Sequence, residues 1–136
     1  MLDLGCGVGG PAREICRFSG AHITGVNNNA HQVKRAQQIS AQCGPAVAQG
    51  CSFVEANFME LPFEDGSYDH AYAIEATCHA PDAAACYREI ARCLRPGGMF
   101  VCYEWVRSLT PKGYDQTTPM CTSVDQRFGG MFVCYE

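Results

Sequence analysis

A glycine-rich stretch near the N-terminus, GCGVGG at residues 5–10, is well suited to holding a small molecule. It follows an apolar run and has the spacing G-x-G-x-x-G, in which missing side chains let the backbone approach a ligand at the start of a helix. The same spacing also suits a tight strand-to-helix turn that binds nothing. The motif therefore predicts a ligand loop and leaves this alternative open.

Two nearby residues bear on the choice between a dinucleotide and S-adenosylmethionine. A dinucleotide site expects an acidic residue about twenty positions further on to bind the ribose hydroxyls, whereas this sequence has Asn27 there. An amide can still hydrogen-bond a diol, so Asn27 weakens the dinucleotide hypothesis without excluding ribose binding. Asp3 creates the arrangement L-D-x-G-x-G, which is familiar from S-adenosylmethionine-dependent methyltransferases. It can organise the loop beside the amine-bearing end of the cofactor, it can cap loop amides, and the two roles are compatible.

Acidic, imidazole and aromatic side chains follow the later apolar runs. Glu75 ends a predicted strand, where open α/β sheets place ligand-contacting residues, and His79 could relay a proton near neutral pH. Tyr103, Glu104 and Trp105 end the next predicted strand. Each candidate also has a structural interpretation: Glu75 as a solvated strand end or helix cap, His79 as part of a tight turn, and Glu104 as a strand end in solvent.

The elements that must position these residues alternate along the first hundred positions. Apolar runs predict strands at 1–4, 21–27, 51–56, 68–76 and 99–105, and the intervening patterns predict helices at 10–19, 29–42 and 82–95. Such alternation is typical of a parallel sheet with helices on its faces. We therefore expect an α/β fold with a doubly wound, mostly parallel sheet of about five strands.

Composition narrows the class of protein. The 136 residues fit one domain, and a net charge of −4 makes nucleic acid an unlikely partner. The sequence contains no transmembrane run and no signal-peptide pattern. Its ten cysteines include no C-x-x-C pair, so we expect small buried hydrophobic residues rather than disulfides or a metal site.

Four stretches, LDLGCGVGGPAREI, ITGVNNNAHQVKRA, YAIEATCHAPD and LRPGGMFVCYEW, give the chain a specific resemblance. From residue 2 to about residue 107 it resembles the core of sterol C24-methyltransferases, and GVNNN and IEATCHAP are much narrower signatures than a glycine loop. The resemblance implies a Rossmann-like class I methyltransferase fold at residues 1–107 and S-adenosylmethionine as the cofactor.

The resemblance also implies roles in the cofactor site. The loop at residues 5–7 would surround the methionine portion, Asn27 and Gln32 would face the ribose, and Asn57 and Phe58 would contact the adenine. Many relatives carry Asp where this chain has Asn57, so weaker binding is expected. The implied cofactor site comprises Asp3, Gly5, Cys6, Gly7, Asn27, Gln32, Asn57 and Phe58.

The implied reaction is methylation of a sterol side-chain alkene, which generates a carbocation. The protein must then stabilise positive charge and accept a proton, for which Glu75, His79 and Glu104 are the candidate catalytic residues. The alternatives are a non-catalytic remnant that binds S-adenosylmethionine and a methyltransferase for another small molecule, such as a tocopherol-like lipid. By family resemblance, the full-length enzyme would associate with the cytoplasmic side of the endoplasmic reticulum membrane.

The family resemblance implies more chain than this sequence contains. Class I methyltransferases have seven strands against five expected here, so we expect a truncated core of reduced activity whose last strand has an open apolar edge. Residues 108–136 are expected to be irregular. They end in GGMFVCYE, an identical copy of residues 97–104, which we interpret as a duplication or as a segment that pairs with the open edge.

Overall fold

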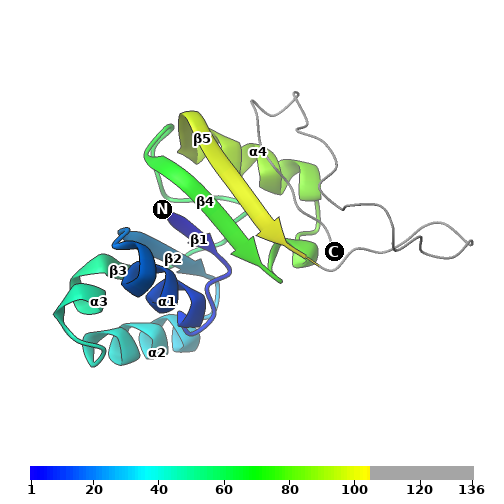
Figure 1. Ribbon diagram of the computed structural model, residues 1–136. Coiled ribbons are helices and arrows are strands. Elements are labelled where there is room, and N and C mark those ends of the chain that lie inside the picture. Colours follow the sequence, from blue (N-terminus) through cyan, green and yellow to red (C-terminus); the bar gives the residue numbers. More distant parts are fainter. Residues whose placement is uncertain (105–136) are drawn as a thin grey trace, which may run out of the picture.

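A parallel sheet with helices on both faces is formed by residues 1–104, the part of the chain that the computed structural model describes (Figure 1). Five strands are present, as predicted. The ends of the predicted strand at Trp105 and of the predicted domain at residue 107, and the region 108–136, lie outside the described residues. The elements in chain order are β1 (Leu2–Leu4), α1 (Gly10–Ser19), β2 (Ile23–Asn27), α2 (Ala30–Ala41), α3 (Pro45–Gly50), β3 (Cys51–Glu55), β4 (Tyr68–Ile74), the short 3-10 helix η1 (Thr77–His79), α4 (Ala83–Cys93) and β5 (Leu94–Tyr103).

The strands lie in the order β3-β2-β1-β4-β5, and each neighbouring pair is parallel. The chain builds outward from β1 to β3 and then crosses back to place β4 on the other side of β1. Connections leave β1 and β4 in opposite directions, so a crevice opens at their carboxyl ends, where open α/β sheets bind ligands. The expected α/β class and doubly wound topology are confirmed.

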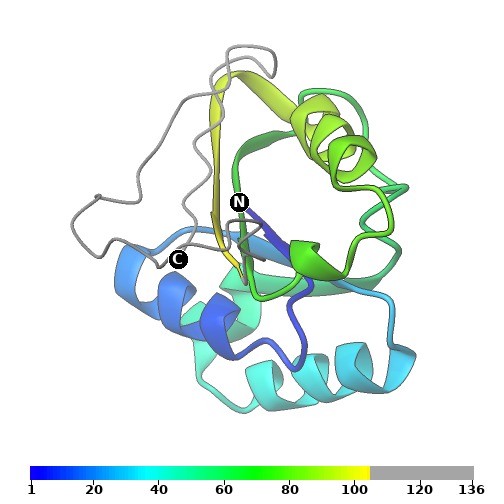
Figure 2. The same ribbon diagram turned by 90° about the vertical axis from the view of Figure 1, so that its right-hand side faces the viewer.

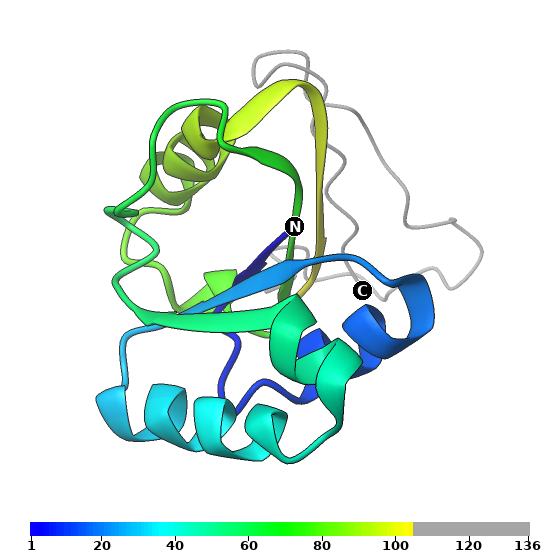
Figure 3. The same ribbon diagram turned by 90° about the vertical axis from the view of Figure 1, so that its left-hand side faces the viewer.

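Successive side chains of each strand point to opposite faces of the sheet, and this divides the core into two layers. Leu2 and Leu4 pack on one face with Ile90 and Phe100, against α4. Asp3 lies between these leucines in β1 and therefore points to the other face, which α1, α2 and α3 cover over β1 to β3. Figures 2 and 3 show α4 on one side of the sheet and α1 and α2 on the other. Asp3 is thus a carboxylic acid in a mainly apolar layer.

The cysteines mostly serve as packing residues. Six of the eight within residues 1–104 are buried, and all eight have free thiols. For these six, the predicted role as small buried hydrophobic residues is confirmed.

Two segments depart from the sequence prediction. The helix α2 ends before Gly44 as predicted, but Pro45 begins the additional short helix α3. Proline suits the first position of a helix because the N–H it lacks would have no partner there. Val47, within α3, is buried and packs the helix onto the core. β5 begins at Leu94 rather than at residue 99, because Leu94 already pairs with Tyr68 across an irregularity in β4.

β5 is the outermost strand on its side of the sheet, and no further strand pairs with its outer edge within residues 1–104. Met99, Val101 and Tyr103 on one of its faces are 45%, 47% and 47% exposed. Within residues 1–104 the edge is therefore open, as expected. The alternative that the copy at residues 129–136 pairs with it falls outside the described residues.

Candidate functional site

A cavity of about 420 Å³ lies at the carboxyl ends of β1 to β4, in the crevice where the strand order reverses. Its volume is within the range usual for small-molecule sites. The structure brings together six of the residues predicted for the site, which are Gly5, Asn27, Asn57, Phe58, Glu75 and His79. Asn28, Met59, Ala76 and Pro81 complete the lining and were not predicted. Five predicted residues lie outside the lining, which are Asp3, Cys6, Gly7, Gln32 and Glu104.

The glycine loop turns sharply because three of its glycines adopt positive φ. Gly5, Gly7 and Gly9 have φ of 70°, 55° and 74°, a region that side-chain-bearing residues rarely occupy. At Gly5 there is also no room for a side chain, since an added Cβ would lie 2.4 Å from the Cβ of Ala76. The start of the loop therefore packs directly on the turn that follows β4.

Cys6 stabilises the glycine loop through two backbone hydrogen bonds. Its N–H donates to the carbonyl of Val26, and its carbonyl accepts from the N–H of Gly9 at 2.8 Å. The side chain is buried, and burial followed by the charge of Asp3 raises the pKa of the Cys6 thiol to about 12. Cys6 thus shapes the loop through its backbone, and its thiol is not suited to nucleophilic chemistry.

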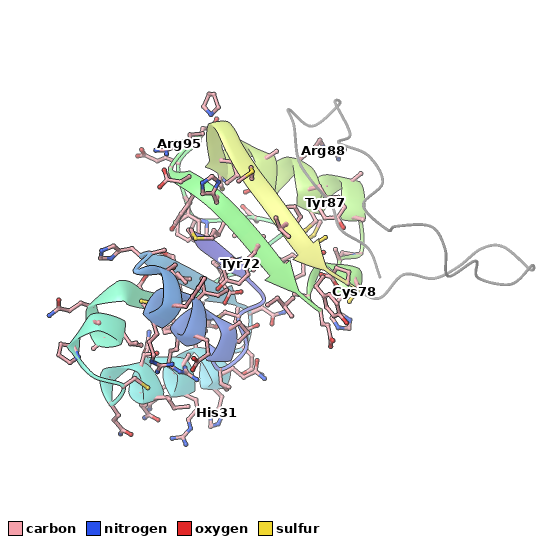
Figure 4. The ribbon with its side chains drawn as sticks, viewed as in Figure 1. His31, Tyr72, Cys78, Tyr87, Arg88 and Arg95 are labelled. Atoms are coloured by element: carbon pink, nitrogen blue, oxygen red, sulfur yellow. The ribbon has the colours of Figure 1, made fainter. Side chains whose placement is uncertain are left out.

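Asp3 lies behind the loop and is only 2% exposed. Burial raises the pKa of its carboxyl to about 7, against a smaller lowering by the nearby Tyr72 hydroxyl. Within residues 1–104, neither Oδ2 of Asp3 nor the Tyr72 hydroxyl has a partner in hydrogen-bonding geometry. Oδ2 of Asp3 therefore caps no loop amide. Figure 4 places Tyr72 on β4, beside β1.

Asn27 and Gln32 meet at the end of β2. The side-chain amide of Asn27 donates to Oε1 of Gln32 at 2.5 Å, while the backbone N–H of Gln32 is capped by the side chain of Asn29. The capping interaction starts α2 next to the pocket. Gln32 therefore orients Asn27, which lines the cavity, rather than lining it itself.

Asn57 and Phe58 enter the pocket from the segment that joins β3 to β4. Oδ1 of Asn57 accepts from the N–H of Met59 at 2.9 Å, and its backbone carbonyl accepts from the N–H of Glu60. An amide oxygen has a second lone pair that remains usable. The local turn thus holds Asn57 in place and leaves it able to accept one further hydrogen bond.

Arg92, a residue that no sequence pattern singled out, holds this segment. Arg92 of α4 donates five hydrogen bonds, to both carboxylate oxygens of Glu89, to Asp65, and to the carbonyls of Leu61 and Phe63. These bonds use all five donors of a guanidinium group. No local pattern predicts them, because the partners in the segment precede Arg92 by 27 to 31 positions.

Glu75 and His79 follow β4 and face the cavity from exposed positions. Glu75 has φ of 51° and is the one non-glycine residue within residues 1–104 with positive φ. Its backbone N–H donates to the carbonyl of Tyr103 at 2.7 Å. The 3-10 turn η1 then carries His79 back to the pocket. A carboxylate and an imidazole thus share one wall, a pairing able to stabilise positive charge and to accept a proton.

Glu104 lies apart from these two residues. It is 5% exposed, so the structural alternative of a strand end in solvent is wrong. Its Oε1 accepts from the N–H groups of Ala76 and Thr77 and from the Thr77 hydroxyl. The structure therefore does not bring Glu104 to the pocket together with Glu75 and His79.

The described residues contain no group of three or more His, Cys, Asp or Glu side chains placed to hold a metal ion. None of their helices has both the length and the apolar character needed to cross a membrane.

Comparisons with known proteins give consistent matches. The family described as "Methyltransferase domain" matches residues 2–102. Cycloartenol-C-24-methyltransferase of Arabidopsis thaliana is 54% identical over 105 residues, which cover 77% of this chain and 31% of that protein. Sterol 24-C-methyltransferase of Saccharomyces cerevisiae is 47% identical over 119 residues, which cover 88% of this chain and 30% of that protein. The chain thus spans about a third of the length of these curated relatives.

Solved structures share the fold. Geranyl diphosphate C-methyltransferase from Streptomyces coelicolor, in complex with Mg²⁺, geranyl diphosphate and S-adenosyl-L-homocysteine, has a TM-score of 0.69 at 25% identity over 74% of this chain and 36% of that chain. The [4+2]-cyclase SpnF has a TM-score of 0.71 at 27% identity over 98% of this chain and 46% of that chain.

Proposed function

The chain belongs to the methyltransferase domain family, and from this premise we propose that its pocket binds S-adenosylmethionine and that the methyl acceptor is the side-chain alkene of a sterol. The acceptor class follows the names of the relatives, two of which are cycloartenol and sterol C-24 methyltransferases. This chain covers about a third of the length of each of these two relatives. That the 136 residues catalyse the reaction by themselves is therefore part of the proposal. Association of the full-length enzyme with the cytoplasmic side of the endoplasmic reticulum membrane is also part of it.

The observation that carries the cofactor proposal is the convergence of polar side chains from three strand ends on one cavity. Asn27, Asn57 and Glu75 are far apart in sequence, yet all three line it. The pocket also meets two requirements of a nucleoside-containing cation: side-chain amides for ribose hydroxyls, and a glycine backbone that a ligand can approach. Phe58 and Met59 add an apolar wall suited to a base. The residues present therefore fit the cofactor.

Within the proposal, Gly5 and the loop behind it would hold the methionine portion, Asn27 would hold the ribose, and Asn57 and Phe58 would hold the adenine. When bound, S-adenosylmethionine supplies an electrophilic methyl group. Buried Asp3 lies too deep for direct contact and would act through the loop.

The residues of the protein itself would act on the methyl acceptor after it receives the methyl group. An alkene that gains a methyl group becomes a carbocation and must lose a proton. Glu75 would stabilise the positive charge, because a carboxylate facing a cavity attracts a cation. His79 on the same wall would take the proton on an imidazole nitrogen.

Two alternatives use the same cavity. One is a remnant that binds S-adenosylmethionine without transferring its methyl group. The other is transfer to a different small molecule, which is favoured by the likeness to a geranyl diphosphate C-methyltransferase, since one fold hosts many acceptors.

Two measurements test the proposal. Calorimetric titration of the 136-residue chain with S-adenosylmethionine is expected to give saturable binding, which Asn27→Leu weakens by about tenfold through one lost hydrogen bond. Gln38→Ala, an exposed change on α2, serves as the control. Incubation with methyl-labelled cofactor and a sterol alkene is then expected to label the sterol. Binding without label would favour the remnant, and the absence of heat at about 1 mM ligand would contradict the cofactor proposal.

A further inference from the structure

Three successive backbone N–H groups after β4 all donate to the end of β5. The N–H of Glu75 donates to the carbonyl of Tyr103 at 2.7 Å. The N–H groups of Ala76 and Thr77 donate to Oε1 of Glu104 at 3.0 and 2.6 Å. The Thr77 hydroxyl adds a third bond to Oε1 of Glu104 at 2.7 Å. Consecutive N–H groups that converge in this way form a site for an anion, and here a side chain of the protein itself fills it.

The anion is well held. Burial acts to raise the pKa of the Glu104 carboxyl, but the hydrogen bonds from Thr77, Cys78 and the two backbone amides outweigh burial and leave the pKa below its ordinary value. Figure 4 places Cys78 beside the end of β5, in agreement with this contact. The turn therefore holds Oε1 of Glu104, whereas Oε2 is buried without a hydrogen-bond partner within residues 1–104, and Glu104 does not line the cavity.

The turn that Glu104 holds is strained and forms one wall of the pocket. Glu75 has φ of 51°, which costs a residue with a side chain free energy that its surroundings must offset. Ala76 packs on Gly5, whose missing Cβ would lie 2.4 Å from the Cβ of Ala76. A relaxed turn would thus move Glu75, Ala76 and the start of the glycine loop together.

We propose that Glu104 is a positioning residue: its carboxylate acts as an internal anion that fixes the turn at residues 75–77, and so places Glu75 and His79 against the cofactor loop. The role of this positioning in methyl transfer rests on the proposed function. It replaces the sequence-based prediction that Glu104 itself takes part in catalysis.

The test compares two substitutions of one residue. The Glu104→Gln side chain keeps an oxygen that can accept from Ala76 and Thr77, whereas Glu104→Ala leaves both N–H groups buried without a partner. For a positioning residue, Glu104→Gln is expected to bind S-adenosylmethionine within about threefold of the unmodified chain, and Glu104→Ala about tenfold or more weakly. The rate of methyl transfer at saturating cofactor is expected to follow the same order, with a fall on the order of 10²-fold for Glu104→Ala.

A stability control separates positioning from general destabilisation. Val47→Ala creates a small cavity in the layer beneath α3, on the other side of the sheet from α4, and lowers stability without contacting the turn. At equal thermal midpoint, adjusted with urea, Val47→Ala is expected to keep normal affinity and Glu104→Ala is not. Equal affinities would overturn the proposal. A Glu104→Gln variant that is folded yet as inactive in transfer as Glu104→Ala would also overturn it, because an amide can position the turn but cannot accept a proton.

Amide hydrogen exchange makes the inference testable apart from the proposed function. The Thr77 N–H is expected to be protected in the unmodified chain and in Glu104→Gln, and to exchange faster by at least tenfold in Glu104→Ala, with or without cofactor. Loss of protection in a chain that binds no cofactor would support the turn's anchoring while contradicting the proposed function. An unchanged exchange rate in Glu104→Ala would overturn the anchoring itself.

Discussion

The buried carboxyl of Asp3 should make the stability of the folded chain fall as pH rises through neutrality. Burial raises its pKa from 3.8 to about 7, so between those values the folded chain holds a proton that the unfolded chain has lost. Because the unfolded state binds fewer protons, the free energy of unfolding decreases with pH across this window and levels off above about pH 7. Over the roughly two units between about pH 5 and pH 7, a slope of about 1.36 kcal/mol per unit predicts a loss of about 2.7 kcal/mol.

Asp3→Asn isolates this contribution. The amide keeps the size of the side chain and its approach to Tyr72, and it cannot ionise next to the thiol of Cys6. Urea unfolding followed by circular dichroism is expected to give similar stabilities for the two chains near pH 5, and to find Asp3→Asn more stable by about 2–3 kcal/mol near pH 8. Glu64→Gln, at an exposed position, should leave the pH dependence unchanged. If Asp3→Asn shows the same pH dependence as the unmodified chain, the assignment of the raised pKa is refuted.

Three further substitutions test the pocket walls. Arg92→Lys is expected to cost about 1–2 kcal/mol in urea unfolding, because a lysine has three donors for five bonds; unchanged stability would contradict the clamp on residues 61–65. Gly5→Ala is expected to cost about 1–3 kcal/mol and to weaken cofactor binding, because its Cβ meets Ala76 at 2.4 Å. Gly10→Ala, whose Cβ meets open space, should stay within about 0.5 kcal/mol in the same measurement. Glu75→Gly is expected to raise stability by up to about 1 kcal/mol by relieving the positive φ while abolishing label transfer; retained transfer would exclude a role for the Glu75 carboxylate.

Features set by neighbouring residues could be predicted well. Strand and helix positions follow apolar periodicity and glycine or proline punctuation, which are local properties. The pocket positions of Asn27 and Glu75 follow from one topological rule, that parallel strands bring their carboxyl ends to the same edge. The helix α3 was not predicted, because the proline at position 45 is a typical signal for the end of the preceding helix and here also occupies the first position of the next one.

The burial of the two carboxylates and their distant partners could not be predicted. Asp3 and Glu104 are both carboxylates at strand positions next to pocket elements, and their sequence contexts do not distinguish them. Each has one buried carboxylate oxygen without a hydrogen-bond partner within residues 1–104, yet the structure shifts their pKa values in opposite directions. Burial raises the pKa of Asp3, whereas hydrogen bonds from a turn 27 to 28 positions away lower the pKa of Glu104.

By itself, the sequence determined the five strands and three of the four α-helices within residues 1–104, the glycine loop and the set of polar residues at the strand ends. Only the tertiary structure decided which of those residues face the cavity and which hold its walls. The physical reason is that ionisation and hydrogen bonding depend on the groups within a few ångströms. For Glu104 and Arg92 those groups include partners that lie some thirty positions away along the chain.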